Sequence, residues 1–65
     1  MNKFLIRGWK DNVQIHEHCV ESDAMPGIWA HAGIEEWPDA ERVSVHVSEP
    51  GGERRVANVV RGGIK

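Results

Sequence analysis

The sequence predicts an α+β fold in which one short helix packs on one face of a four-stranded, mostly antiparallel sheet. Valines alternate with polar residues over 42–48, which is typical of a half-buried strand. Apolar residues recur at helical spacing over 25–32, and turn-forming residues separate the remaining short apolar runs. The resulting order is β-β-α-β-β, and a helix laid on a sheet is the simplest arrangement that buries both apolar faces.

The first two strands are predicted at Lys3–Arg7 and Val13–Val20. The segment Gly8–Asn12 between them predicts a turn, because Gly, Asp and Asn tolerate the backbone conformations that turns need. Alternation along the second strand places His16, His18 and Val20 on one face and Val13, Ile15 and Cys19 on the other.

A helix of about ten residues is expected next, stabilised mainly by tertiary packing. Ser22 or Asp23 supplies a side-chain oxygen for its N-cap, and Gly33 is a suitable residue to end it. Its apolar stripe follows the i, i+3, i+4, i+7 spacing and is expected to face the sheet; it consists of Met25, Ile28, Trp29 and Ala32.

The connection Ile34–Asp39 leads to the alternating strand Arg42–Ser48, the loop Glu49–Glu53 and a returning strand Arg54–Arg61. Residues 62–65 are expected to fray. A strand order of 2-1-3-4 makes every neighbouring pair antiparallel, and the sequence leaves other orders open.

Composition narrows the class of protein. A chain of 65 residues predicts one domain, 1–65, which buries only about 60% of its unfolded surface and leaves little volume for a deep cleft. Apolar residues make up 40%, charged residues 28%, and the net charge is −2, which suits a globular chain rather than a disordered one. No apolar run approaches the length of a membrane span. A single cysteine excludes an internal disulfide framework, so we expect a cytoplasmic protein.

No pattern in the chain predicts catalysis. It contains no nucleophile elbow, phosphate-binding loop or dinucleotide fingerprint, and no cofactor is expected. Cys19 is expected to be a small buried apolar residue, because free cysteine is among the most buried residue types. We therefore predict that the protein is not an enzyme.

The leading hypothesis is a module that binds another protein, with two contact patches. Residues 35–49 carry five acidic residues and one basic residue, and Trp37 stands among them as a large side chain of the type enriched at binding hot spots. The first patch is therefore Trp37, Glu35, Glu36 and Asp39. The second is the open face of the sheet, with Arg7, His16, His18, His46, Arg55 and Arg61. Exposed edge strands also allow self-association into a homodimer.

Two alternatives remain. The cations of the open sheet face suit phosphate groups, although single-strand readers also need exposed aromatic side chains and a basic net charge. The imidazoles of His16, His18 and His46, placed on that same face, suit a metal ion, although the spacing departs from that of known structural zinc sites.

The layout resembles that of small phage-encoded anti-CRISPR proteins. The shared features are the opening strand Lys3–Arg7, the strand Val13–Glu21 running into a Ser22-capped helix, and the closing hairpin Arg42–Arg61 around Pro50-Gly51-Gly52. This resemblance implies a stoichiometric inhibitor that docks on a host defence or nucleic-acid-processing complex. It assigns a role to no individual residue.

Overall fold

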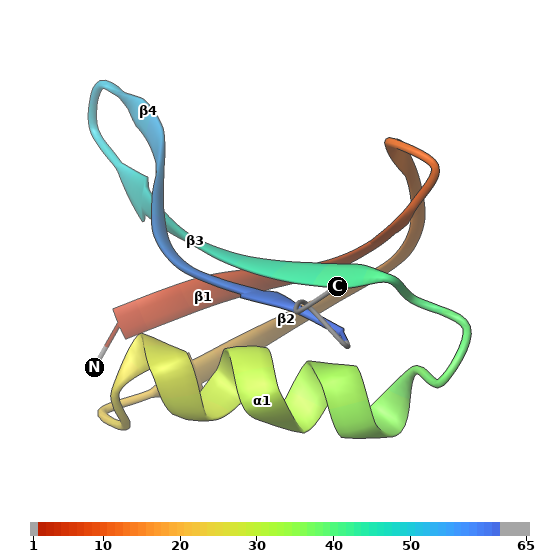
Figure 1. Cartoon of the computed structure of the whole chain (residues 1–65). Helices are drawn as coiled ribbons and strands as arrows, with labels where there is room; N and C mark the ends of the chain where they lie inside the picture. The colour runs from red at the N-terminus through yellow and green to blue at the C-terminus, as the bar shows by residue number, and fades with distance from the viewer. Residues whose placement is uncertain (1, 62–65) are drawn as a thin grey trace.

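A computed structural model describes residues 2–61 and confirms the α+β fold with the order β-β-α-β-β. Its elements are β1 (Asn2–Lys10), β2 (Val13–Ser22), α1 (Pro26–Glu36), β3 (Arg42–Glu49) and β4 (Gly52–Val60). The fraying expected for residues 62–65 lies outside the described residues. The helix lies against one face of the sheet, and the ends of both hairpins bend away from it, so the opposite face is concave (Figure 1).

The sheet has the order β2-β1-β3-β4, and every neighbouring pair of strands is antiparallel. This is the order that keeps all neighbours antiparallel. The central pair, β1 and β3, comes from opposite ends of the chain and sets Ile6 opposite Val45 and Gly8 opposite Val43. Residues opposite one another in a ladder share a face, so these four positions all face α1.

The core lies between this central pair and α1. Val43 and Val45 are fully buried, and Phe4, Ile6 and Ala30 are buried beside them. The alternation that predicted the third strand therefore also identifies its buried face. Small and branched side chains dominate this core, which is consistent with the modest burial available to a short chain.

The first hairpin is longer than the sequence predicts. Gly8, Trp9 and Lys10 belong to β1, so their assignment to a turn is wrong. The turn consists of Asp11 and Asn12, whose φ angles of 52° and 63° lie in the left-handed region. Asp and Asn are among the residues that adopt this conformation at least cost, as two-residue hairpin turns require.

The helix begins later and ends later than predicted. Met25 is its N-cap and makes no side-chain cap, with Pro26 in the first turn. The Ser22 hydroxyl accepts a hydrogen bond from the Ala24 backbone N–H at 2.9 Å, so it stabilises the turn before α1 instead of capping the helix. Gly33 does not end the helix, which continues to Glu36.

The face of α1 that contacts the sheet is not the predicted stripe. Ala30 and Gly33 are its buried residues. A Cβ added at Gly33 would lie 2.8 Å from Val43 Cγ1, so the helix backbone approaches the sheet where its residues are smallest. Met25 and Ile28 are 74% and 58% exposed, which corrects the expectation that they are buried.

Strand β2 also presents the opposite face from the one expected. Its register sets His16 opposite Gly8, His18 opposite Ile6 and Val20 opposite Phe4, so all three side chains lie on the helix side of the sheet. The predicted grouping is right, but its placement on the open face is wrong. Cys19 is exposed rather than buried, because it alternates to the open face.

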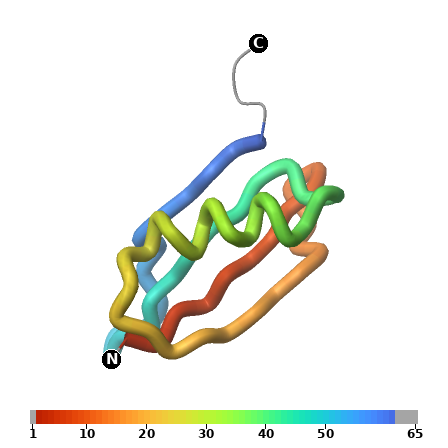
Figure 2. Tube along the Cα trace, turned by 90° about the horizontal axis from the view of Figure 1, so that it is seen from below, coloured from red at the N-terminus to blue at the C-terminus, as the bar shows by residue number. Residues whose placement is uncertain are grey.

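The helix covers only part of the sheet. It packs across β4, β3 and β1, and the contacts do not extend to β2. Seen from the helix side, β2 runs along the uncovered margin of the sheet (Figure 2). No helix within residues 2–61 has the length and apolar character needed to cross a bilayer.

Candidate functional site

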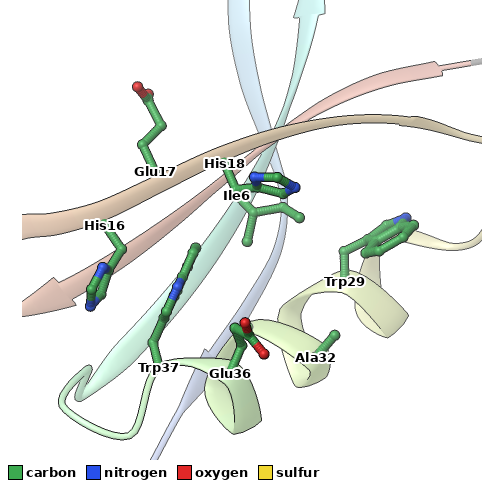
Figure 3. A pocket seen from close by; sticks show the side chains of 9 residues that line it. Ile6, His16, Glu17, His18, Trp29, Ala32, Glu36 and Trp37 are labelled. Carbon is green, nitrogen blue, oxygen red and sulfur yellow. The ribbon is translucent and has the colours of Figure 1, made fainter.

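An open groove of about 340 Å³ separates α1 from the uncovered strand β2. Ile6 and Gly33 contribute to its lining from β1 and α1. Figure 3 shows the side chains around it, which come from both elements; those used below are His16, His18, Trp29, Ala32, Glu36 and Trp37. We call this feature the α1–β2 groove. It exists because the helix stops one strand short of the edge.

Trp37 and His16 form the wall of the groove near the C-terminal end of α1. Their rings stack, with 4.9 Å between centroids and 14° between planes. His16 Nε2 also lies 2.9 Å from a carboxylate oxygen of Asp39. The hydrogen bond with His16 holds the pKa of Asp39 below its ordinary value. The hydrogen bond between His16 and Asp39 joins β2 to the segment after α1. The helix itself does not contact β2.

The position of Trp37 depends on a glycine in β1. A Cβ added at Gly8 would lie 2.8 Å from Trp37 Cε3 and 3.3 Å from His16 Cβ. The indole therefore rests on the backbone of β1 and is partly buried against the core. One side of Trp37 still lines the groove.

Trp29 forms the wall near the start of α1. It packs partly against the core, and its Nε1 is buried without a hydrogen-bond partner within residues 2–61. Such an unpaired donor costs roughly 1–3 kcal/mol. The fold therefore gains packing, and no hydrogen bond, from this indole.

An apolar surface continues from the groove over the outer flank of α1. Ala32 lines both the groove and a shallow hollow beside it, which Met25 and Ile28 also line. We call Met25, Ile28 and Ala32 the α1 flank. The helical stripe predicted from the sequence is thus real, but much of it faces solvent along the groove. Acidic residues border it, since Glu35 lines the hollow and Glu36 lines the groove.

The open face of the sheet carries a network of paired charges. Arg7 donates to Glu17 at 3.0 Å and, through both terminal nitrogens, to the Glu53 carboxylate at 2.8 and 3.1 Å. These hydrogen bonds lower the pKa of Glu53. Two carboxylates therefore surround the central cation of the predicted basic face, which makes Arg7 a poor phosphate contact.

A second network on the same face links β1 to β3. The Trp9 indole N–H donates to the buried Ser44 hydroxyl at 2.8 Å, and this oxygen lies 2.9 Å from His46 Nε2. The Arg42 guanidinium covers the Trp9 ring, 4.8 Å from its centroid. Burial lowers the pKa of His46, and the nearby charge of Arg7 lowers it further. A neutral His46 can then accept a hydrogen bond from the Ser44 hydroxyl group at Nε2.

Arg61 binds the backbone around the end of α1. Its guanidinium donates to the backbone carbonyls of Trp37 and Ala40, each at 2.8 Å, and to that of Ile34. The Ile34 carbonyl lies in the last turn of α1, where carbonyls have no partner inside the helix. The other two acceptors lie in the segment after the helix, so Arg61 ties that segment to the helix end. Arg55 is exposed and stays on the open face opposite His46.

The predicted patches are thus rearranged. His16 and His18 leave the second patch and line the groove with Trp37 and Glu36, and Asp39 is bonded to His16. Arg7, His46 and Arg55 remain on the open face. Glu35 lies on the outer side of α1. The three-histidine metal site cannot form as predicted, because His46 lies on the opposite face from His16 and His18. Within residues 2–61 no cluster of three potential metal ligands is present.

Sequence reasoning missed the residues that shape the groove. Gly8 was assigned to a turn, and no sequence signal marks a glycine that a tryptophan covers. The α1 flank could have been found, because Ile28 and Ala30 are two residues apart and cannot lie on the same helix face. The choice between these two faces depends on how closely the helix approaches the sheet.

Comparison of the chain with family models, curated proteins and solved structures found no match.

Proposed function

We propose that this protein is a non-catalytic binding module that docks on a partner protein through the α1–β2 groove and the α1 flank. The observation that carries the proposal is the continuity of these two surfaces. Trp37, Trp29 and Ala32 line the groove, and Ile28 and Met25 extend the apolar strip into solvent. Contiguous exposed apolar surface on a small protein marks an interaction site.

The groove is already shaped before binding. Trp29 and Trp37 are each held against the core, and Trp37 is further fixed by its stack with His16. Side chains that are ordered in the free protein lose little conformational entropy on association, so more of the contact energy is retained. Tryptophan held in this way is typical of binding hot spots.

The charge around the groove indicates the partner's chemistry. Glu35 and Glu36 border the apolar strip, and neither α1 nor β2 contains lysine or arginine. Opposite charges on two binding surfaces raise the association rate and disfavour partners of the wrong charge. We therefore expect an apolar contact surface with basic residues at its edge. An inhibitor that blocks a host complex by docking, as the layout resemblance implies, would use this surface.

The test begins by trapping the partner. A photo-crosslinking amino acid replaces Ala32 in the groove or Asn58, an exposed residue of β4 on the open face. The expected result, in cells of the source organism, is a discrete protein adduct from position 32 and none from position 58. An adduct from position 58 alone would contradict the proposal.

The second step compares two matched substitutions against the trapped partner. Ile28 on the α1 flank and Val60 on the open face are 58% and 54% exposed, so neither substitution to glutamate should disturb the core. Ile28→Glu should weaken binding by about tenfold or more, while Val60→Glu should change it little. Equal effects of the two substitutions would overturn the proposed docking surface.

A further inference from the structure

Strand β2 is an uncovered edge of the sheet. It is the outermost strand on its side of the sheet, and within residues 2–61 no other strand pairs with its outer edge. Its ten residues include no lysine or proline, two residues that commonly protect edges, and its carboxylates are those of Glu17 and Glu21. The helix does not cover it either. Its outer backbone N–H and C=O groups are therefore free to pair with another strand.

Most of this edge is regular enough to act as a template. The register of β1 against β2 shifts between Gly8 and Trp9, opposite the start of β2, and is continuous from His16 to Ser22. A regular run of about seven residues is longer than the typical strand. The bulge lies at the turn end, where it limits pairing to this run.

The two faces of β2 differ in chemistry. On the helix side, His16, His18 and Val20 lie beside the α1–β2 groove, with its two indoles. On the open side, the alternate positions are Glu17, Cys19 and Glu21, all exposed. A strand added at this edge would place every second side chain over the groove and the others beside a row of carboxylates.

We infer that the partner contributes an extended segment that pairs with β2 as a fifth strand, with apolar side chains toward α1 and lysine or arginine side chains toward Glu17 and Glu21. This inference rests on the proposed function and specifies its partner. Main-chain hydrogen bonds along the edge supply affinity, and the groove selects the alternate side chains. Opposite charges in adjacent strands add to this affinity.

A second copy of this chain is a poorer occupant of the same edge. Pairing two β2 strands about a twofold axis brings Glu17 and Glu21 of both copies together on one face. Like charges in adjacent strands are destabilising, and β2 offers no cation to compensate them. The charge pattern therefore favours a basic segment of a different protein.

The test uses two blocked octapeptides of identical composition as probes. One alternates valine and lysine, and the other has four valines followed by four lysines. Backbone amide shifts and hydrogen exchange of the isotope-labelled protein are followed during titration. The alternating peptide should produce saturable shifts and slowed exchange over residues 16–22. It should bind several-fold more tightly than the block peptide, and methylation of its alternate backbone nitrogens should abolish the difference.

Two variants test the charge pattern with the same peptide. Glu21→Gln removes a carboxylate from β2, and Glu41→Gln removes another exposed one, which lies just before β3 and lines neither the groove nor the α1 flank. Glu21→Gln should weaken binding by about threefold, in keeping with one cross-strand charge pair, and Glu41→Gln should have a smaller effect. Equal effects would overturn the predicted position of the basic residues.

Three further outcomes would overturn the inference. Shifts confined to α1 without slowed exchange in β2 would show that the groove is occupied but not by a strand, which leaves the proposed function intact. The absence of saturable shifts with either peptide would exclude pairing of an extended basic segment with β2. The comparison of Ile28→Glu with Val60→Glu then tests the proposed docking surface separately. A dimer of the free protein with β2 already protected would make a second copy the occupant.

Discussion

The imidazole of His16 lies flat against the indole of Trp37, with 4.9 Å between the ring centroids. The two residues belong to the edge strand and to the end of the helix, and Gly8 lies beneath both. This stack closes one end of the α1–β2 groove. It is also the contact that ties the uncovered strand to the helical layer.

The hydrogen bond between His16 and Asp39 predicts an acid-dependent term in stability. The pKa of Asp39 is lowered from 3.8 in the folded protein by its hydrogen bond with His16. The unfolded state binds the proton more readily, so this stabilisation is present above pH 3.8 and is lost as the pH falls through the lowered value. Asp39→Asn should therefore lower the free energy of unfolding at pH 5 and have no effect at the most acidic pH. Urea unfolding followed by tryptophan fluorescence measures it.

A second variant provides the control for the hydrogen bond between His16 and Asp39. His16→Phe keeps a flat ring beside Trp37 but cannot bond the carboxylate. In that background, Asp39→Asn should have a much smaller pH-dependent effect, because only a backbone hydrogen bond and the charge of Lys10 still lower the pKa of the carboxyl group. A full effect in the absence of the imidazole would show that another group stabilises the carboxylate.

Three glycines allow matched substitutions to alanine. An added Cβ at Gly33 would lie 2.8 Å from Val43, and one at Gly8 would lie 2.8 Å from Trp37, whereas Gly27 faces open space. Overpacking of this kind costs about 1–3 kcal/mol, so Gly33→Ala and Gly8→Ala should be destabilising. Gly27→Ala should stabilise by up to about 1 kcal/mol, because it improves helix propensity. Chemical denaturation of all three variants measures this. Stabilisation by Gly33→Ala would contradict the close approach of α1 to β3.

Arg61 is predicted to stabilise the end of the helix through geometry rather than charge. Arg61→Lys keeps the charge but cannot reach the carbonyls of Ile34, Trp37 and Ala40 together. It should lower the free energy of unfolding by about 1–2 kcal/mol, allowing for the exposure of the side chain. Hydrogen exchange in the last turn of α1 should become faster. Arg55→Lys, an exposed arginine on β4, is the control and should stay within about 0.5 kcal/mol. Equal losses of unfolding free energy in Arg61→Lys and Arg55→Lys would show that the hydrogen bonds of Arg61 are not the cause.

His46 predicts a loss of stability at mildly acidic pH. Its pKa is lowered from 6.5, mainly by burial and then by the charge of Arg7. The unfolded chain takes up this proton first, so stability is greatest above pH 6.5 and falls as the pH drops from 6.5 through the lowered value. His46→Gln should reduce this part of the pH dependence. The exposed His31→Gln is the matched control, and proton NMR titration of the imidazoles gives the pKa directly. A His46 value above 6.5 would contradict the prediction.

The arrangement of the strands was predictable because the sheet carries strong local signals. The valines of β3 alternate strictly with polar residues, and both turn segments contain residues that favour bent backbone. The boundaries of β1 were not predictable from the same signals. Gly8 has the composition of a turn residue, but it lies in the strand because Trp37 needs a position without a side chain.

The face of each element that is buried depends on neighbours far away in sequence. In β2 the apolar residues are divided between both faces, and only the pairing of His18 with Ile6 decides which face meets the helix. In α1 the longest apolar side chains suggested the buried face, yet Ala30 and Gly33 occupy it because the helix backbone lies close to Val43. Local periodicity cannot measure that distance. The placement of the two histidines and the α1 flank therefore required the structure.

The pairing of β1 with β3 bears on how the chain comes off the ribosome. Trp9 and Ser44, which bond across the middle of the sheet, are separated by 35 positions. Because β3 is synthesised after β1, one edge of β1 stays unpaired until β3 has emerged. Contacts between such distant positions slow folding relative to local ones. During that interval the β1–β2 hairpin has two unpaired edges, whereas in the folded sheet only the edge of β2 remains open.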